Sequence, residues 1–241
     1  MDIIKVKDYQ EMSEKACSHV INNIHRQDAP VLGLATGSTP EGLYKQLIEK
    51  YRQKKVSFEQ TTTFNLDEYV GLENDDRNSY HYYMQEKLFN HIDISAEKAN
   101  LPNGSAADLE QECRNYEAQI QQANGIDLQI LGIGLNGHIG FNEPGVSFAS
   151  RTHVVDLAAS TREANARFFP SLEDVPTQAI TMGIETIMES KAILLLVSGK
   201  QKTEAVARFV NGEISEGFPA SVLQQHPQVT LIADEAALGE V

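Results

Sequence analysis

The chain has 241 residues, with 20 Lys or Arg against 34 Asp or Glu, and a formal net charge of −14. Such a negative surface repels polyphosphate, so we expect neither nucleic acid nor an anionic membrane as a partner. The chain lacks an apolar run near the roughly 20 residues of a membrane span, and its amino-terminal residues lack a signal peptide's apolar core. Cys17 and Cys113 are too far apart for a CxxC motif or a Cys-rich zinc site. We therefore expect a cytoplasmic enzyme or small-molecule binder.

Strand-like and helix-like patterns alternate along the chain. Apolar residues at steps of four predict a helix near the amino terminus, formed around Met12, Ala16, Val20 and Ile24. The other expected elements are strands at residues 31–35, 61–66, 127–133, 191–197 and 228–232, and helices at residues 40–52, 78–90, 106–123 and 200–210. Short apolar runs alternating with amphipathic helices favour an α/β fold, a single open, mostly parallel Rossmann-like sheet with helices on both faces.

We expect a single domain over residues 1–241, because no repeat, low-complexity stretch or long linker interrupts this pattern. The irregular regions are residues 73–77, 138–150 and 169–178. The last of these contains two prolines and belongs to a candidate lid near residues 157–180. An ordinary surface loop would have the same composition, so both interpretations stay open.

The first candidate ligand site is the segment Ala35-Thr-Gly-Ser-Thr-Pro40, which follows a predicted strand. The sequence predicts a helix with Thr39 as N-cap and Pro40 at the first helical position. The N–H groups at such a helix start suit a phosphate. A plain strand-to-helix turn with a good cap would look the same. It is not a Walker loop, because Gly-Lys-Ser/Thr does not follow.

A second candidate is the acidic pair that follows the strand at residues 61–66. Asp67 comes directly after this strand, at the rim of the expected sheet, where a carboxylate could act as a general base. A solvated acidic residue in a turn is the commoner outcome for such a position.

The third candidate follows the strand at residues 127–133 and is rich in glycine. The spacing of Gly132, Gly134 and Gly137 spells GxGxxG and resembles a dinucleotide fingerprint. The glycines and proline that follow, up to Gly145, prevent the long helix whose start would hold a pyrophosphate. We therefore expect no nicotinamide or flavin cofactor.

The same loop brings together Asn136, His138 and Glu143. A carboxylate can orient an imidazole and favour its charged form, so this group could move protons. Zinc would use the same residue types, but neither HExxH nor the zinc-deaminase signature is present. No metal is expected.

Candidate cations come from two further segments. Lys202 lies in the first turn of the helix expected at residues 200–210, which is the unfavourable end of the helix dipole unless an anion binds there. Arg167 is a second candidate, although a surface arginine is the commoner outcome. Because the carboxyl ends of parallel strands share one rim, we expect these groups to converge there.

Several segments together resemble a known family, nearly end to end. They are Leu34-Ala-Thr-Gly-Ser-Thr-Pro40, Thr63-Phe-Asn-Leu-Asp-Glu-Tyr-Val-Gly-Leu72, Gly137-His-Ile-Gly-Phe-Asn-Glu-Pro144 with Ser150-Arg-Thr152, and Leu223-Gln-Gln-His-Pro227. On these motifs the chain resembles the glucosamine-6-phosphate deaminases, also called glucosamine-6-phosphate isomerases. The related 6-phosphogluconolactonases share the fold and the phosphate loop but lack the second and third motifs, so they are the alternative.

The resemblance implies a cofactor-free reaction of amino-sugar catabolism, in which glucosamine 6-phosphate and water give fructose 6-phosphate and ammonia. It implies that His138 moves the proton of ring opening and that Asp67 carries a proton from carbon 2 to carbon 1. The implied catalytic residues are Asp67, Asn136, His138 and Glu143, and the implied phosphate-binding residues are Gly37, Ser38, Thr39, Arg167 and Lys202. A lactone hydrolase and a non-catalytic sugar-phosphate sensor remain the competing functions.

Two departures from the family pattern matter. Many members have Asp where this chain has Asn136; its carbonyl can still accept an N–H from the histidine, so we expect ring opening to survive. Allosteric hexameric members carry Arg and Lys where His153 and Val155 stand, and they extend past the position of Val241. We therefore expect hyperbolic kinetics, no activation by N-acetylglucosamine 6-phosphate, and a monomer or small homo-oligomer.

Overall fold

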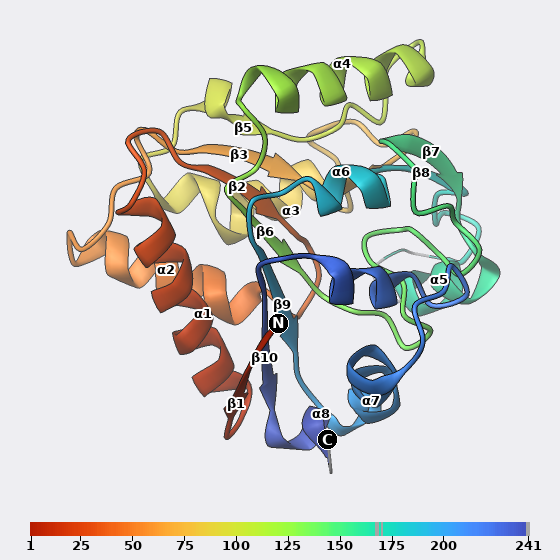
Figure 1. The fold of residues 1–241 in the computed structure, drawn as a ribbon. Helices are drawn as coiled ribbons and strands as arrows, with labels where there is room; N and C mark the ends of the chain where they lie inside the picture. The colour runs from red at the N-terminus through yellow and green to blue at the C-terminus, as the bar shows by residue number, and fades with distance from the viewer. Residues whose placement is uncertain (167–168, 170, 240–241) are drawn as a thin grey trace.

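The computed structural model describes residues 1–166, 169 and 171–239. Within them, seven strands form one sheet in the order β1-β10-β9-β6-β2-β3-β5 (Figure 1). In that order, the strands are Asp2–Val6, Val229–Asp234, Ile193–Val197, Leu128–Leu131, Val31–Leu34, Thr62–Asn65 and Ala99–Asn100. All neighbouring pairs in this sheet are parallel. The mostly parallel α/β sheet predicted from the sequence is confirmed.

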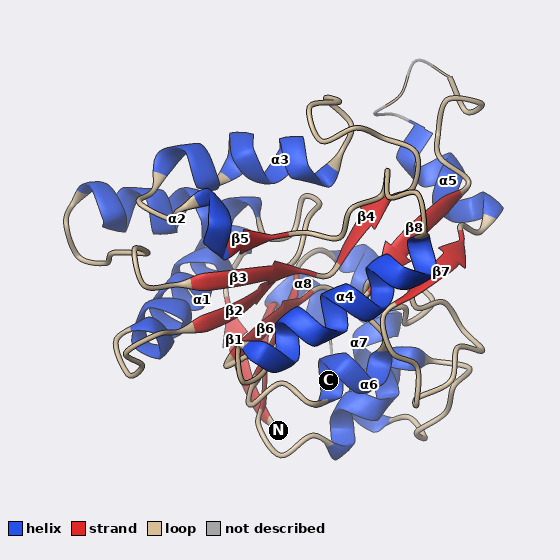
Figure 2. Cartoon of the chain, turned by 90° about the horizontal axis from the view of Figure 1, so that it is seen from above, coloured by secondary structure: helices blue, strands red, loops and turns tan. Residues whose placement is uncertain are grey.

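Helices cover both faces of this sheet (Figure 2). One face carries α1 (Tyr9–Ile24), α2 (Glu41–Arg52) and α3 (Tyr80–Lys87), and the other carries α4 (Leu109–Gln122), α6 (Ile184–Met188) and α7 (Thr203–Asn211). Successive side chains of a strand point to opposite faces. In β9, Leu194 and Leu196 therefore pack in the first layer, whereas Leu195 and Val197 pack in the second.

A second, smaller sheet adjoins the first. Its strands are antiparallel, in the order β4 (Asp67–Tyr69), β8 (Gln178–Thr181) and β7 (His153–Asp156), and α5 (Ala159–Asn165) follows β7. We did not predict this sheet, because strands of three or four residues carry too short a hydrophobic pattern. Residues 178–180 of the candidate lid lie within β8.

The start of α2 differs from the prediction. Pro40 is the N-cap, and the side chain of Thr39 does not cap the helix, so both expectations for this helix start are wrong. Pro40 has φ −84° and ψ −4°, close to helical values, and its carbonyl accepts the N–H of Tyr44 at 3.0 Å. The helix therefore begins at Glu41, one residue later than expected.

Two other expected helices are divided into segments. The helix predicted at residues 78–90 is α3 followed by a 3₁₀ turn, Phe89–His91. The helix predicted at residues 200–210 begins as the 3₁₀ turn Lys200–Lys202 and continues as α7. A 3₁₀ turn at a helix end is a tighter winding of the backbone and is common at helix termini.

The two thiols and the surface charges have simple environments. Cys17 and Cys113 are free and buried, and burial raises the pKa of each thiol to about 11.

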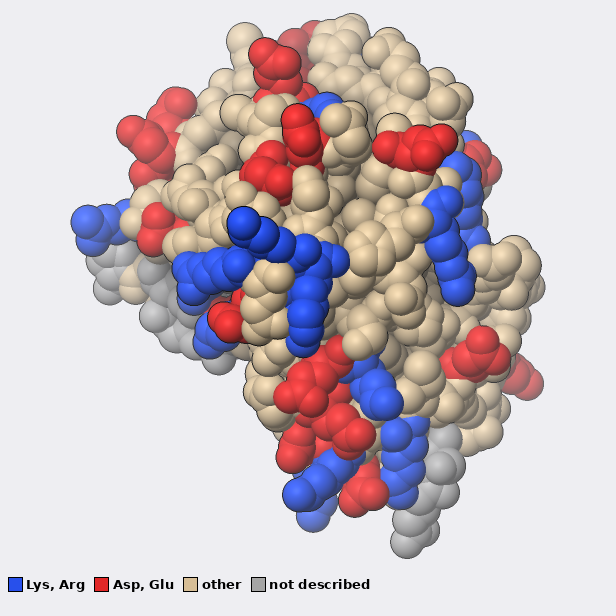
Figure 3. All heavy atoms as spheres, turned by 90° about the vertical axis from the view of Figure 1, so that its left-hand side faces the viewer, with Lys and Arg blue, Asp and Glu red and all other residues tan. Residues whose placement is uncertain are grey.

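Basic and acidic side chains are mixed on the face of the molecule shown in Figure 3, although the chain as a whole carries a formal net charge of −14. Of the helices in the described residues, none combines the length and apolar character needed to cross a bilayer.

Candidate active site

The turn after β2 lies near the middle of the sheet's carboxyl edge. In the strand order, β2 stands between β3 and β6. From β2 the chain adds β3 on one side and later β6 on the other, so the direction of strand addition reverses here. Open α/β sheets bind ligands at such a switch point. Gly37 has φ 89°, a left-handed conformation that favours glycine. Tyr83 from α3 donates to the carbonyl of Gly37 at 2.6 Å, and Tyr9 from α1 donates to that of Ser38 at 2.9 Å.

The hydroxyl groups of these two tyrosines, which belong to α3 and α1, thus bind the carbonyl groups of the turn. The N–H groups of Gly37, Ser38 and Thr39 find no backbone acceptor among the described residues. A row of such N–H groups can bind an anion. The turn therefore has the chemistry that a phosphate needs, although its helix starts one residue later than the sequence predicted.

Lys202 approaches the same edge of the sheet. Its Nζ donates to the carbonyl of Ile133 at 2.7 Å, and burial lowers its pKa. A Cβ on the adjacent Gly132 would lie 4.0 Å from Oγ1 of Thr39, so this part of the chain borders the turn after β2. An anion there would stabilise the partly desolvated ammonium group. The other predicted cation, Arg167, lies outside the described residues.

Asp67 is buried, with 7% of its surface exposed, and it is not the solvated turn residue considered from the sequence. It begins β4 directly after β3 and pairs with Thr181 of β8, because the chain passes here from one sheet into the other. Burial, followed by the charge of Glu68, raises the pKa of Asp67 to about 8. A Cβ on Gly140 would lie 3.5 Å from its Oδ2, so the carboxyl group faces the loop after β6.

Within that loop, Asn136 joins His138 to Glu143. The Asn136 Nδ2 donates to Glu143 Oε2 at 2.6 Å, and Asn136 Oδ1 lies 2.8 Å from His138 Nδ1. A carboxylate can only accept, so the amide turns its oxygen toward the imidazole and His138 Nδ1 must carry a hydrogen. In the neutral ring, Nε2 is then left as a proton acceptor.

Glu143 is held in its charged form by its neighbours. Interaction with His138, whose Nδ1 is 3.6 Å from Glu143 Oε1, lowers the pKa of Glu143 to about 2; partial burial opposes this, and Asn136 and Thr161 reinforce it. Thr161 on α5 donates to Glu143 Oε1 at 2.8 Å. Sequence reasoning missed Thr161, since only the fold brings α5 to this carboxylate.

The described residues contain no group of three His, Cys, Asp or Glu side chains arranged to hold a metal ion. The site instead brings Asp67 to the loop that carries His138, next to a turn suited to phosphate. Tyr9 and Tyr83 were also missed from the sequence. A run of aromatic residues at 80–83 is the only signal that could have indicated a hydroxyl contact.

A family model described as glucosamine-6-phosphate isomerases/6-phosphogluconolactonase matches residues 7–232. The chain belongs to this family. Relatives named glucosamine-6-phosphate deaminase include one from Oceanobacillus iheyensis, 63% identical over 100% of this chain and 96% of that protein. Another, glucosamine-6-phosphate deaminase 1 from Bacillus subtilis, is 53% identical over 98% of each chain.

Two solved structures resemble this chain to different degrees. A monomeric glucosamine-6-phosphate deaminase is 53% identical, with a TM-score of 0.96 over 98% of each chain. The 6-phosphogluconolactonase of Thermotoga maritima is 22% identical, with a TM-score of 0.76 over 97% of this chain and 99% of that one. The second likeness extends to the fold alone.

Not every family-motif residue of this chain lies at the site. His226, in the motif at residues 223–227, is buried, and its Nε2 is 2.7 Å from the carbonyl of Ser190. Its Nδ1 accepts the N–H of Gln228 at 3.1 Å, so Nε2 carries the hydrogen that the Ser190 carbonyl accepts. Both ring nitrogens are therefore occupied by backbone groups, and this histidine stabilises the fold.

Proposed function

We propose that this chain converts glucosamine 6-phosphate and water to fructose 6-phosphate and ammonia. Family membership and the identity to named deaminases support the reaction. The observation that carries the proposal is the approach of Asp67, with its raised pKa, to the loop that holds His138. Asp67, as the base that removes a proton from carbon, and His138, as the group that opens the ring, then act on the same bound sugar.

The phosphate is the group that positions the substrate. Gly37, Ser38 and Thr39 bind it through their N–H groups, and Lys202 adds a positive charge. Arg167 joins them by the family resemblance. Holding a substrate in register with a catalytic group can supply about 7–11 kcal/mol of the barrier reduction.

Ring opening falls to His138. Nε2 accepts the proton of the anomeric hydroxyl and donates it to the ring oxygen as the carbon–oxygen bond breaks. The imidazolium formed between these two transfers is stabilised through Nδ1 by the carbonyl of Asn136 and by the charge of Glu143. A positioned acid or base of this kind contributes about 10²–10⁴ in rate.

Asp67 then performs the isomerisation. The open-chain aldehyde acidifies the proton on carbon 2. The carboxylate removes this proton while the aldehyde oxygen takes up a proton from the substrate's own ammonium group, which gives the neutral enolamine. Asp67 returns the proton to carbon 1, leaving an imine at carbon 2. Water adds to the imine, ammonia leaves, and the ketone of fructose 6-phosphate results. The raised pKa of about 8 makes this carboxylate a stronger base than an exposed one.

The experiment is to incubate the protein with glucosamine 6-phosphate and to measure ammonia and fructose 6-phosphate. Asp67→Asn should abolish turnover and leave phosphate binding intact. Binding of the sugar phosphate without ammonia release would favour a sensor. Hydrolysis of 6-phosphogluconolactone in place of deamination would favour the lactonase function.

The remaining expectations belong to this proposal. The chain acts as one domain and as a monomer or small homo-oligomer, supported by the similar deaminase described as monomeric. Two free, buried thiols fit a cytoplasmic location. The candidate lid near residues 157–180, of which 167, 168 and 170 lie outside the described residues, is supported by the contact of Thr161 with Glu143. Light scattering with and without substrate tests the oligomeric state.

A further inference from the structure

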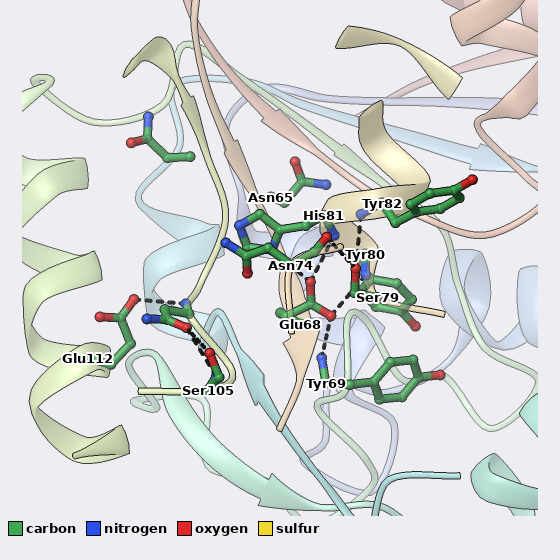
Figure 4. A network of polar contacts seen from close by, with 12 residues as sticks. Asn65, Glu68, Tyr69, Asn74, Ser79, Tyr80, His81, Tyr82, Ser105 and Glu112 are labelled. Atoms are coloured by element: carbon green, nitrogen blue, oxygen red, sulfur yellow. Dashed lines mark hydrogen bonds and ion pairs between the residues drawn. The ribbon is translucent and has the colours of Figure 1, made fainter. Parts of the chain in front are cut away.

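Glu68 is a buried carboxylate that the proposed mechanism does not use. It lies on β4 next to Asp67, and its side chain is 1% exposed. Because successive residues of a strand point to opposite faces, Glu68 turns away from the face on which Asp67 lies. It points to the start of α3, as Figure 4 shows.

Four hydrogen bonds hold the Glu68 carboxylate. Oε1 accepts the backbone N–H groups of Tyr69 at 2.8 Å and Tyr80 at 2.9 Å. Oε2 accepts the backbone N–H of His81 at 2.8 Å and lies 2.9 Å from its Nδ1. The first N–H groups of a helix have no partner within the helix, and negative charge stabilises that end. Glu68 thus ties the start of α3 to β4.

The helix α3, held by Glu68 in this way, also contacts the turn after β2, which is proposed to bind the phosphate. Tyr83 on α3 donates to the carbonyl of Gly37 at 2.6 Å. The ring centroid of Tyr80, at the start of the same helix, lies 4.8 Å from that of Tyr69 on β4. A shift of α3 would therefore move residues that hold the turn.

We propose that Glu68 is a positioning residue for the deaminase reaction, holding α3, and through α3 the phosphate-binding turn, in place relative to Asp67. This inference rests on the proposed function of the site. The carboxylate acts through its backbone partners and does not itself touch the substrate. It sets the distance between the group that holds the phosphate and the base that removes the proton from carbon 2.

The charge of Glu68 has a second effect that distinguishes this role from a purely structural one. After burial, this charge is the second cause that raises the pKa of Asp67. Three tyrosines face Asp67: Tyr69 from β4, Tyr80 from α3 and Tyr116 from α4. Burial raises the pKa of each hydroxyl, so all three stay neutral. The loop after β6, which also carries His138 and Glu143, approaches the Asp67 carboxyl group at Gly140. Removing the Glu68 charge should therefore lower the pKa of Asp67.

The test compares Glu68→Gln with Ser79→Ala. The amide of Gln brings N–H groups against the donors of α3, so kcat should fall about 10–100-fold with a smaller change in KM. The acidic limb of the kcat/KM profile should move to lower pH by about one unit. Ser79 caps the same helix by accepting the N–H of Tyr82 at 3.0 Å. Ser79→Ala should lower Tm and leave the acidic limb in place.

Three outcomes would overturn the proposal, and a fourth would refute the function on which it rests. An unchanged kcat and an unchanged acidic limb in Glu68→Gln would overturn the proposal, as would equal losses in both variants with no shift of the limb. If Glu68→Gln does not fold, His81→Phe removes one donor to the carboxylate, and its acidic limb should move to higher pH; an unmoved limb overturns the proposal. Absence of ammonia from the unmodified protein would instead refute the proposed function.

Discussion

The hydroxyl of Thr161 donates to Oε1 of Glu143 at 2.8 Å, so α5 contacts the carboxylate that faces His138. Thr161→Val removes this bond and leaves one oxygen of Glu143 with fewer partners. A hydrogen bond to a charged group is worth about 1.5–3 kcal/mol, so kcat should fall about tenfold or more. Thr161→Ser keeps the hydroxyl and is the control. Equal steady-state rates for the Val and Ser variants would contradict a role for this contact.

Asn136→Asp tests how charge at this position affects ring opening. A second carboxylate beside Nδ1 would stabilise the imidazolium relative to the neutral, proton-accepting ring. We expect the pH–rate profile to move toward higher pH relative to the unmodified protein. Superimposable profiles for the two proteins would argue against an electrostatic role for residue 136.

Asp67→Asn should raise stability while it removes activity. The pKa of Asp67 is about 8 in the folded protein against an ordinary value of 3.8, so the folded state binds the proton more tightly. The stability that this proton provides is complete below about pH 4 and is lost as the pH rises through about 8. Near pH 9, Asp67→Asn should have a free energy of unfolding about 1–3 kcal/mol above that of the unmodified protein.

Calorimetry at two pH values checks this prediction. The advantage of Asp67→Asn should vanish below about pH 4, where both states of the unmodified protein hold the proton. A stability difference that does not depend on pH would show that the carboxyl group is not desolvated.

Gly134→Ala should displace the imidazole of His138. A Cβ at residue 134 would overlap the ring of His138, whose carbonyl also accepts the N–H of Gly134 at 2.9 Å. A misplacement of about 1 Å can cost about 10² in rate. We expect kcat for deamination to fall by about this factor, with KM changing less. Gly125→Ala provides a control glycine outside the site, and its kcat should stay near that of the unmodified protein.

The chain should follow hyperbolic kinetics. His153 and Val155 occupy the positions of the Arg and Lys that the resemblance assigns to the allosteric site of hexameric members. His153 instead points its Nδ1 to the carbonyl of Arg151, 2.7 Å away. Rates measured against glucosamine 6-phosphate should fit a single hyperbola with or without N-acetylglucosamine 6-phosphate. A sigmoidal curve relieved by that ligand would refute this expectation.

The parallel sheet was predictable because its strands are buried on both faces and read as apolar runs, as at residues 193–197. The loop with Asn136 and His138 was also visible, since its glycines and polar residues are close in sequence. The burial of Asp67 was not predictable. It depends on β8, which lies far along the chain and pairs with β4 only in the folded state.

The role of Glu68 was equally hidden in sequence. Its partners, Tyr80 and His81, are 12 and 13 residues away, and the intervening residues 73–77 read as an irregular loop. No periodicity relates a strand carboxylate to the start of a helix that packs beside it. Contacts of this kind follow from how elements meet, which local propensity does not encode.

The pairing of β1 with β10 has a consequence for how the chain is made. β10 lies between β1 and β9, so the first strand can dock only after the last has been synthesised. Until then β1 is an unpaired edge, and α1, the next element along the chain, is one that contacts it. Completion of this edge of the sheet therefore waits until β10 has been synthesised and is free to pair.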